Sequence, residues 1–280
     1  MKKIVLVFAA MLFVFVAAYA SYSYLSREAF IREADANALK LNQVAEQVGF
    51  EDLSGYFGNT KGSFVLFDRN RNQYLIYNEA ESQKRASSVS TFKILNSLIG
   101  LETKVLQDEN TLFKWNGKHN YIDAWNRDHT LASAFSNSVV WYYQEVASKV
   151  GKERMQGFLR EAKYGNADIS GGLTEFWLDS SLRISPLEQV AFLRRFYSYE
   201  LPFSRSNIDT VKKIMVMTQD DRVTLSGKTG LAGNHLGWFV GYVERDENVF
   251  FFATKVTGNN IENPTARKIT QDILRGKGIQ

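Results

Sequence analysis

A serine and a lysine three residues apart are the first candidates for chemistry in this 280-residue chain. Ser90 and Lys93 begin a stretch in which apolar residues, from Ile94 to Leu101, would surround almost the whole circumference of a helix. Residues at positions i and i+3 share a helix face, so the Ser90 hydroxyl and the Lys93 amine can come within hydrogen-bonding reach. Because a serine hydroxyl is a poor nucleophile until a base takes its proton, this pair predicts a serine nucleophile with a lysine base.

Burial determines whether the Lys93 amine is charged, neutral or converted to a carbamate. Desolvation disfavours an ammonium in an apolar helix and lowers the pKa of the amine by several units, unless the charge finds a partner. A neutral amine can act as a base directly, or it can react with CO2 to form a carbamate, which is a carboxylate-like base. The alternative interpretation is structural: Lys93 extends its charge to solvent, and Ser90 caps the helix.

Two further short motifs follow along the chain. Lys228-Thr229-Gly230 ends a predicted strand, where a lysine and a hydroxyl can bind a ligand carboxylate and Gly230 lets a substrate approach the backbone. Ser138 lies within Ser136-Asn137-Ser138-Val139-Val140 at the head of an amphipathic segment, where serines can also be simple helix caps. Each motif alone fits an ordinary turn, but Ser-x-x-Lys, a central serine and Lys-Thr-Gly in this order are typical of penicillin-recognising serine enzymes.

The composition excludes several other classes of protein. With 45% hydrophobic, 14% aromatic and 23% charged residues, the chain is neither disordered nor collagen-like. A net charge of +4 is too small to indicate a nucleic-acid partner. Without cysteine there is no disulfide, thiolate nucleophile or zinc knuckle, and His119, His129 and His235 lack the spacing of metal ligands. We therefore expect no metal site.

The N-terminus has the pattern of an export signal. Two lysines precede an uninterrupted apolar run over residues 4–18, and Ala18-Tyr19-Ala20 is a small-x-small site that predicts cleavage after Ala20. The alternative is an uncleaved anchor in the membrane, although the run is short for a span of about 20 residues. Either form would place the folded part outside the cytoplasmic membrane, secreted or tethered in the cell envelope.

The order of predicted elements indicates an α+β fold. We expect a signal peptide over residues 1–20, a leader over 21–58 and one folded domain over 59–280. Strands are predicted over residues 63–68, 73–77, 223–228, 236–243 and 249–256, and helices over 90–101, 138–150, 152–162, 186–198 and 265–274. Strands at both ends of the domain predict a central antiparallel sheet built from both ends of the chain, with a helical lobe inserted between them.

With these elements in place, the chain resembles the class D serine β-lactamases, or oxacillinases, over residues 60–275. It is most similar to the chromosomal class D enzymes of Gram-positive bacteria. The motifs that carry the resemblance are Ser90-Thr91-Phe92-Lys93, Ser138-Val139-Val140, Tyr164-Gly165-Asn166, Phe176-Trp177-Leu178-Asp179, Lys228-Thr229-Gly230 and Gly237-Trp238-Phe239-Val240-Gly241. The resemblance implies the fold of serine β-lactamases and penicillin-binding transpeptidases.

The resemblance also implies a mechanism with no metal or organic cofactor. A β-lactam would acylate Ser90, and Lys93, carboxylated by CO2, would be the general base for acylation and for hydrolysis of the acyl-enzyme. The resemblance implies that the Trp177 indole N–H stabilises the carbamate and that Val140 keeps water out of the carbamate pocket. Ser138 would pass a proton to the leaving nitrogen. Lys228 and Thr229 would bind the substrate carboxylate, and the backbone N–H groups of Ser90 and Leu231 would form the oxyanion hole.

The sequence departs from the family pattern at two places, and two other functions would use the same nucleophile. The family often has a carboxylate-binding arginine where this chain has Ala266; Arg267 lies one position later, a turn of about 100° around a helix, and is not assigned to the site. Glu175 to Asp179 faintly resembles the Glu-x-x-Leu-Asn of class A enzymes. The same nucleophile would serve a penicillin sensor that deacylates slowly, or a peptidoglycan transpeptidase or carboxypeptidase. Oligomeric state and the preferred β-lactam stay open.

Overall fold

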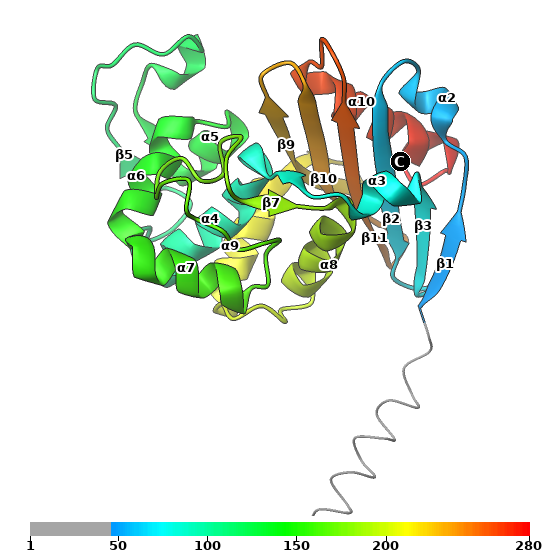
Figure 1. Ribbon diagram of the computed structural model, residues 1–280. Coiled ribbons are helices and arrows are strands. Elements are labelled where there is room, and N and C mark those ends of the chain that lie inside the picture. The colour runs from blue at the N-terminus through cyan, green and yellow to red at the C-terminus, as the bar shows by residue number, and fades with distance from the viewer. Residues whose placement is uncertain (1–45) are drawn as a thin grey trace, which may run out of the picture. The chain divides into compact units, whose positions relative to one another are not determined.

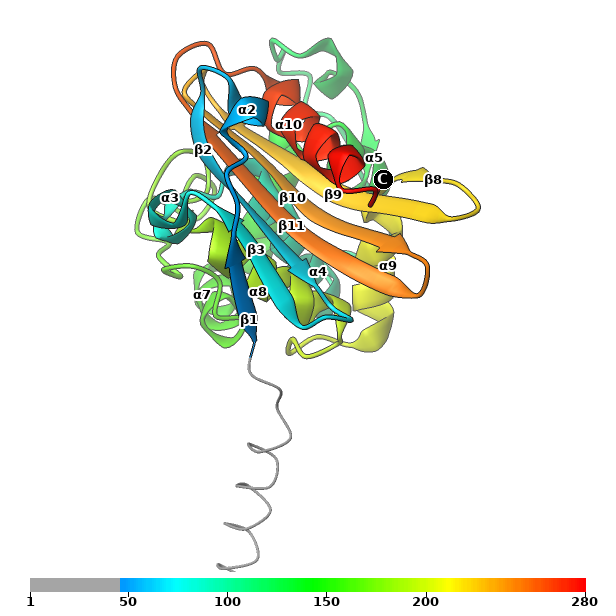
Figure 2. The same cartoon turned by 90° about the vertical axis from the view of Figure 1, so that its right-hand side faces the viewer.

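The computed structural model describes residues 46–280, so the predicted signal peptide lies outside the described residues. Residues Gln47–Gln280 form one compact unit. The unit has a central sheet with helices on both faces, and Figures 1 and 2 show it from two sides. None of the helices in this described part has the length and apolar character needed to cross a membrane.

Seven strands form the central sheet, in the order β1-β3-β2-β11-β10-β9-β8. The strands are β1 (Gln47–Phe50), β2 (Lys61–Asp68), β3 (Gln73–Tyr77), β8 (Val216–Gln219), β9 (Val223–Ala232), β10 (Leu236–Arg245) and β11 (Asn248–Thr257). The two ends of the domain meet where β2 pairs with β11, with Phe64 opposite Thr254. The predicted α+β architecture is therefore confirmed.

The sheet differs from the prediction at its first edge. β1 runs parallel to β3, whereas the other neighbouring pairs of this sheet are antiparallel, so the sheet is mixed rather than purely antiparallel. β1 and the short α2 (Ser54–Phe57) fall within the stretch 21–58 that was expected to be a leader, yet both belong to the compact unit. Their few residues carry too little apolar periodicity to be recognised in the sequence.

The helical lobe lies between β3 and β8 in the chain. Its helices are α3 (Glu79–Gln83), the 3₁₀ turn η1 (Val89–Phe92), α4 (Lys93–Glu102), the 3₁₀ turn η2 (Asp123–Trp125), α5 (Leu131–Ser136), α6 (Val140–Val150), α7 (Lys152–Glu161), α8 (Pro186–Tyr197) and α9 (Arg205–Met215). Two short ribbons join its segments, β4 (Ala86–Ser87) with β7 (Arg183–Ile184) and β5 (Leu112–Phe113) with β6 (His129–Thr130). Figure 2 shows this lobe behind the sheet and α10 (Asn263–Gly276) across the opposite face.

The side chains of β2 alternate between two apolar clusters, one on each face of the sheet. Phe64 and Leu66 belong to the apolar cluster under α10, whereas Val65 and Phe67 belong to the cluster under the helical lobe. Successive side chains of a strand point to opposite faces, so a strand buried on both faces reads as an uninterrupted apolar run. The run Phe64 to Phe67 has this character.

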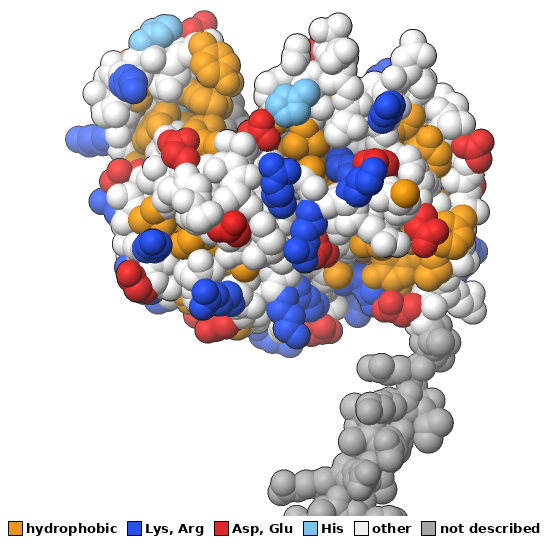
Figure 3. All heavy atoms as spheres, viewed as in Figure 1, with side chains coloured by type: hydrophobic (Ala, Val, Ile, Leu, Met, Phe, Trp, Pro, Cys, Tyr) orange, Lys and Arg blue, Asp and Glu red, His pale blue; other side chains and the backbone are white. Residues whose placement is uncertain are grey.

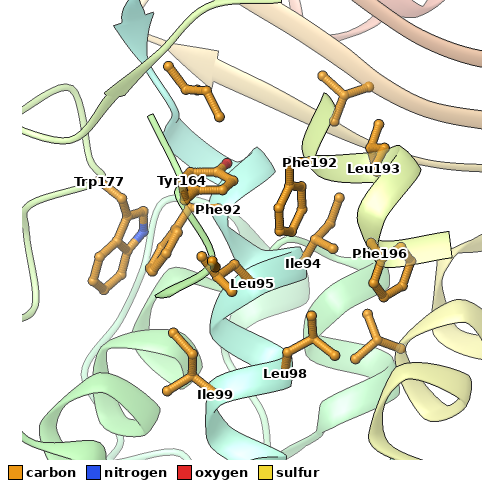
Figure 4. Close-up of a cluster of buried hydrophobic side chains, with 14 of the residues drawn as sticks. Phe92, Ile94, Leu95, Leu98, Ile99, Tyr164, Trp177, Phe192, Leu193 and Phe196 are labelled. Carbon is orange, nitrogen blue, oxygen red and sulfur yellow. The ribbon is translucent and has the colours of Figure 1, made fainter. Parts of the chain in front are cut away.

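Helix α4 is the centre of the lobe. Every residue from Lys93 to Leu101 is buried, as the apolar circumference predicts. Figure 4 shows the Tyr164 and Trp177 side chains of later segments beside Phe92, at the end of the helix where Lys93 begins it. A buried helix of this kind depends on its neighbours for stability, because an isolated helix of ten residues is marginal in water.

Gly241 in β10 tests how closely the sheet must pack. It lies opposite Gly227 on β9, and an added methyl group would overlap the Ser226 carbonyl oxygen and lie 2.7 Å from the Gly227 Cα. Gly241→Ala should lower the free energy of unfolding by about 2–3 kcal/mol, because neither obstacle is a flexible side chain. Urea unfolding followed by circular dichroism measures this change.

The matched control is Gly157→Ala in α7, where the added methyl group meets no atom within 4 Å. This variant should be as stable as the wild type or more stable by up to about 1 kcal/mol, because alanine is the better helix former. Equal stabilities of the two variants would contradict the packing described for β9 and β10.

Candidate active site

A cleft of about 620 Å³ lies between the helical lobe and the end of β9. Figure 3, viewed as in Figure 1, shows the surface hollowed between the segment around β5 and the turn that joins β9 to β10. Six of the residues predicted for the site line this cleft: Ser90, Ser138, Val140, Thr229, Gly230 and Leu231. Segments more than 100 positions apart in the chain therefore meet here. The other three predicted residues, Lys93, Trp177 and Lys228, are buried beside it.

Ser90 and Lys93 are in direct contact. η1 carries Ser90 and passes directly into α4, so the Lys93 Nζ donates to the Ser90 Oγ at 2.8 Å. The Lys93 side chain is wholly buried, with its Nζ 5.3 Å from the centre of the Tyr143 ring. Desolvation, and then the nearby charge of Lys228, hold the pKa of Lys93 well below its ordinary value of 10.5. The amine is therefore suited to accept a proton at neutral pH.

The turn that carries the nucleophile is strained and tightly packed. Val89 has a φ of +40°, in the left-handed region that β-branched residues rarely adopt. A methyl group added at Gly230 would lie 2.7 Å from the Val89 Cγ2 and 3.4 Å from the Ser90 nitrogen. Gly230 was predicted to let a substrate approach the backbone; the structure shows that it also makes room for the turn beside Ser90.

Ser138 lies in a turn rather than at a helix cap. It has a φ of +57° between α5 and α6, and its backbone N–H donates to the Phe135 carbonyl oxygen at 3.2 Å. α6 begins at Val140, later than predicted, and Val139 caps it without a side-chain hydrogen bond. The capping interpretation therefore does not hold for Ser138, which faces the cleft.

Lys228 is nearly inaccessible, with 4% of its surface exposed. Its Nζ donates to the Thr229 carbonyl oxygen at 3.1 Å and lies 5.7 Å from the centre of the Phe135 ring. Burial lowers the pKa of Lys228 to about 7. β9 also continues to Ala232, past the predicted end of the strand, so that Thr229, Gly230 and Leu231 follow one another along the cleft.

Trp177 places an indole N–H without a hydrogen-bond partner in the core. Its side chain is wholly buried, its ring centre lies 5.6 Å from that of Phe92, and its indole Nε1 has no hydrogen-bond partner. Figure 4 shows the two rings side by side. A buried N–H without an acceptor is costly, and this one lies beside Phe92, the residue before α4.

Sequence reasoning missed most of the apolar wall of the cleft. Tyr121, Ile122, Trp125 and Leu178 line it, and no spacing in the polar stretch around Tyr121 signals this. At its rim the His235 Nε2 lies 3.2 Å from an Asp179 carboxylate oxygen. This contact joins two turns that are far apart in the sequence, so neither turn alone predicts it.

The C-terminal helix brings an amide rather than a guanidinium to the cleft. Asn263, its first residue, lines the cleft, whereas Arg267 does not. Ala266 is buried against the sheet near Gly237. Residues 46–280 contain no group of three or more histidine or acidic side chains placed to hold a metal ion.

Comparison with known proteins agrees with this site. A family model described as the penicillin binding protein transpeptidase domain matches residues 62–275. The probable β-lactamase YbxI of Bacillus subtilis is 43% identical over 225 residues, which are 80% of this chain and 83% of that protein. A solved class D β-lactamase from Bacillus subtilis matches with a TM-score of 0.79 and 42% identity, over 82% of this chain and 96% of that one. The chain belongs to the class D β-lactamases.

Class D β-lactamases are hydrolases, but the same fold serves receptors. The C-terminal domain of the Bacillus licheniformis BlaR penicillin receptor matches this class D chain with a TM-score of 0.81 and 40% identity. The match covers 84% of this chain and 98% of that domain. The receptor domain is thus as similar in fold as the enzymes.

Lys228→Met tests the electrostatics of the site. Between pH 7 and 10.5 the unfolded state keeps the Lys228 proton while the folded state has lost it, so wild-type stability rises with pH in this window. Methionine does not titrate. The stability advantage of Lys228→Met over the wild type should therefore shrink by a few kcal/mol from pH 7 to 10, at about 1.4 kcal/mol for each pKa unit.

Urea unfolding at several pH values measures this difference. Lys114→Met, which makes the same substitution at an exposed lysine, is the control. A constant difference for Lys228→Met would show that the burial of Lys228 does not shift its titration.

Proposed function

We propose that this class D β-lactamase hydrolyses β-lactams through an acyl-enzyme on Ser90. Lys93, carboxylated by CO2, is the general base in acylation and in deacylation. One observation carries the proposal: the Ser90 Oγ lies 2.8 Å from the Nζ of a wholly buried lysine, at the wall of an open cleft. An adjacent base with a lowered pKa is what a serine nucleophile needs near neutral pH.

In acylation the Ser90 Oγ forms a bond to the β-lactam carbonyl carbon and gives up its proton to the base at position 93. The carbon–nitrogen bond of the ring then breaks, and the ring nitrogen receives a proton through Ser138, whose side chain lies on the same cleft. In deacylation a water molecule attacks the ester carbon and gives a proton to the base at position 93. The ester C–O bond to Ser90 then breaks, and the base returns the proton to the Ser90 Oγ. No bond in this sequence requires a redox partner or a metal.

The surroundings of Lys93 fit its carboxylation. A carbamate at Nζ would supply an anionic oxygen that takes the proton from Ser90 and later from water. Reaction with CO2 needs an uncharged amine, which the lowered pKa of Lys93 provides. The unpartnered Trp177 N–H is a ready donor to a buried anion, and Val140, the first residue of α6, lines the cleft and would limit access of water to that anion.

Substrate binding would use the edge of β9. Backbone N–H groups of Ser90 and Leu231 would stabilise the oxyanion, which is typically worth about 10²–10³ in rate for each donor. The Thr229 hydroxyl would bind the substrate carboxylate, and Lys228 would act from behind it, because its Nζ is held by the Thr229 carbonyl oxygen.

A slowly deacylating penicillin sensor is the second candidate function. The similarity to the BlaR receptor domain favours it, since that domain matches this chain over nearly its whole length. Both functions share acylation of Ser90 and differ in whether water then releases the acyl group.

We also propose that the chain is exported. The lysines at positions 2 and 3, the apolar run over residues 4–18 and Ala18-Tyr19-Ala20 support a cleaved signal peptide. A protein that destroys β-lactams outside the cytoplasmic membrane meets them before they reach their targets.

Turnover of nitrocefin or benzylpenicillin by the purified protein, with and without added bicarbonate, tests the proposed function. Many turnovers with a rate that bicarbonate raises are expected for the hydrolase. A single stoichiometric burst that bicarbonate does not extend would instead support the sensor.

Ser90→Ala should abolish covalent labelling by a fluorescent penicillin, because it removes the hydroxyl that accepts a hydrogen bond from the Lys93 Nζ. Gel fluorescence after denaturation measures the label. The control is Ser63→Ala, which removes a buried and unpartnered hydroxyl from β2 and should leave labelling intact. Persistent labelling of Ser90→Ala would contradict the assignment of the nucleophile.

Trp177→Phe keeps an aromatic ring and removes the indole N–H. We expect the bicarbonate concentration for half-maximal turnover to rise on the order of tenfold, because the carbamate loses a donor in the core. Trp115→Phe is the matched control, since its indole N–H donates to the Lys118 carbonyl oxygen at 3.0 Å, away from the cleft. An unchanged bicarbonate dependence in Trp177→Phe would refute the proposed role of Trp177.

A further inference from the structure

Thr91, the residue after the nucleophile, is wholly buried and does not line the cleft. Its hydroxyl donates to the Ser88 carbonyl oxygen at 2.6 Å, and its backbone N–H donates to the same oxygen at 3.1 Å. These two hydrogen bonds close the turn that contains Ser90. The shape of the turn therefore depends on a side chain that points into the core.

A second side chain holds Thr91 from behind. The Gln189 Nε2, on α8, donates to the Thr91 Oγ1 at 2.8 Å. The hydroxyl has one proton, which it gives to Ser88, so its oxygen is free to accept from the amide. The Tyr164 hydroxyl lies farther away, 3.4 Å from the Thr91 Oγ1 and 3.5 Å from the Gln189 Nε2. Buried polar groups from three segments thus meet behind the nucleophile.

Packing alone does not account for a glutamine at position 189. The side chain is wholly buried in a helix whose other buried residues are mostly apolar, and its Oε1 has no hydrogen-bond partner. An unmet acceptor in the core carries a desolvation penalty that an apolar residue of the same size would avoid. The contact with Thr91 is the interaction that methionine at this position would lack.

The strain at Val89 explains why such support is needed. A β-branched residue at a φ of +40° persists only where its surroundings hold it. Gly230 of β9 packs against Val89 on the cleft side of the turn. Gln189 and Thr91 hold the Ser88 carbonyl on the core side. Between these supports, Ser90 is held in contact with Lys93.

We propose that Gln189 is a positioning residue for Ser90. Through the Thr91 hydroxyl and the Ser88 carbonyl, it keeps the strained turn in the conformation that places the Ser90 Oγ beside the Lys93 Nζ. The inference rests on the proposed function of Ser90 as the nucleophile. It adds a residue on α8, outside the cleft, to the groups that determine the acylation rate.

The test is the rate constant for acylation by a fluorescent penicillin in Gln189→Met, Thr91→Val and the double variant. Each single change should lower the rate on the order of tenfold to a hundredfold, because small displacements of a reacting group have effects of this size. The double variant should be no slower than the slower single variant, since both changes break one chain of contacts.

Two further measurements separate positioning from a general loss of structure. Thr91→Ser keeps the hydroxyl and should recover most of the wild-type rate, whereas Tyr164→Phe, which removes only the longer contacts, should slow acylation less than Gln189→Met. The thermal unfolding midpoint of Gln189→Met should be unchanged or raised, because its core loses an unmet acceptor.

A wild-type acylation rate in Gln189→Met, or losses that add in the double variant, would overturn the inference. So would a slowed rate accompanied by an equal loss of folded protein. If the wild type itself is not acylated at Ser90, both this inference and the proposed function fail. If the wild type is acylated and Gln189→Met matches it, only the role of Gln189 fails.

Discussion

The burial of a lysine amine without a carboxylate partner is the constraint around which this structure is arranged. Among the ion pairs of the described residues, none involves Lys93, and the charge that helps to lower its pKa is another cation, Lys228. Two ammonium groups in a desolvated core repel each other strongly. The site is therefore more stable when Lys93 is uncharged, and in the proposed carbamate form the repulsion would become attraction.

The fold supplies the desolvation by surrounding α4 on every side. Helices from the whole lobe and aromatic residues such as Trp177 close over it, and β9 packs through Gly230 against η1, the 3₁₀ turn that precedes α4. The same packing leaves several polar atoms without partners, including the Trp177 Nε1 and the Gln189 Oε1. Such groups lower the stability of a core, and the proposed roles of the two residues that carry them give both a part in the chemistry of Ser90.

Local sequence patterns predicted much of this arrangement. The apolar circumference of residues 94–101 predicted a buried helix, and Ser185-Pro186 predicted the start of α8, where the Ser185 hydroxyl accepts from the Glu188 N–H. Both signals lie within one element. The three motifs around Ser90, Ser138 and Lys228 predicted which segments meet, because their order is typical of a known family.

Features that depend on contacts between distant segments could not be predicted. The sequence patterns did not predict α9 or β1. The residues of α9 were not distinguished from their polar surroundings, and β1 is a short exposed strand at the edge of the sheet. The strain at Val89 and the link from Gln189 to Thr91 arise only when the 3₁₀ turn, α8 and β9 come together. No periodicity in the sequence reports a positive φ or a hydrogen bond between residues 98 positions apart.

The pH dependence of the rate of Ser90 acylation tests the central claim most directly. With a base at position 93 whose pKa lies well below 10.5, the single-turnover rate of penicillin acylation should already be near its maximum at pH 7–8 and change little above it. A rate that instead rises about tenfold with each pH unit up to pH 10 would show that Lys93 keeps its ordinary pKa, and it would contradict the account.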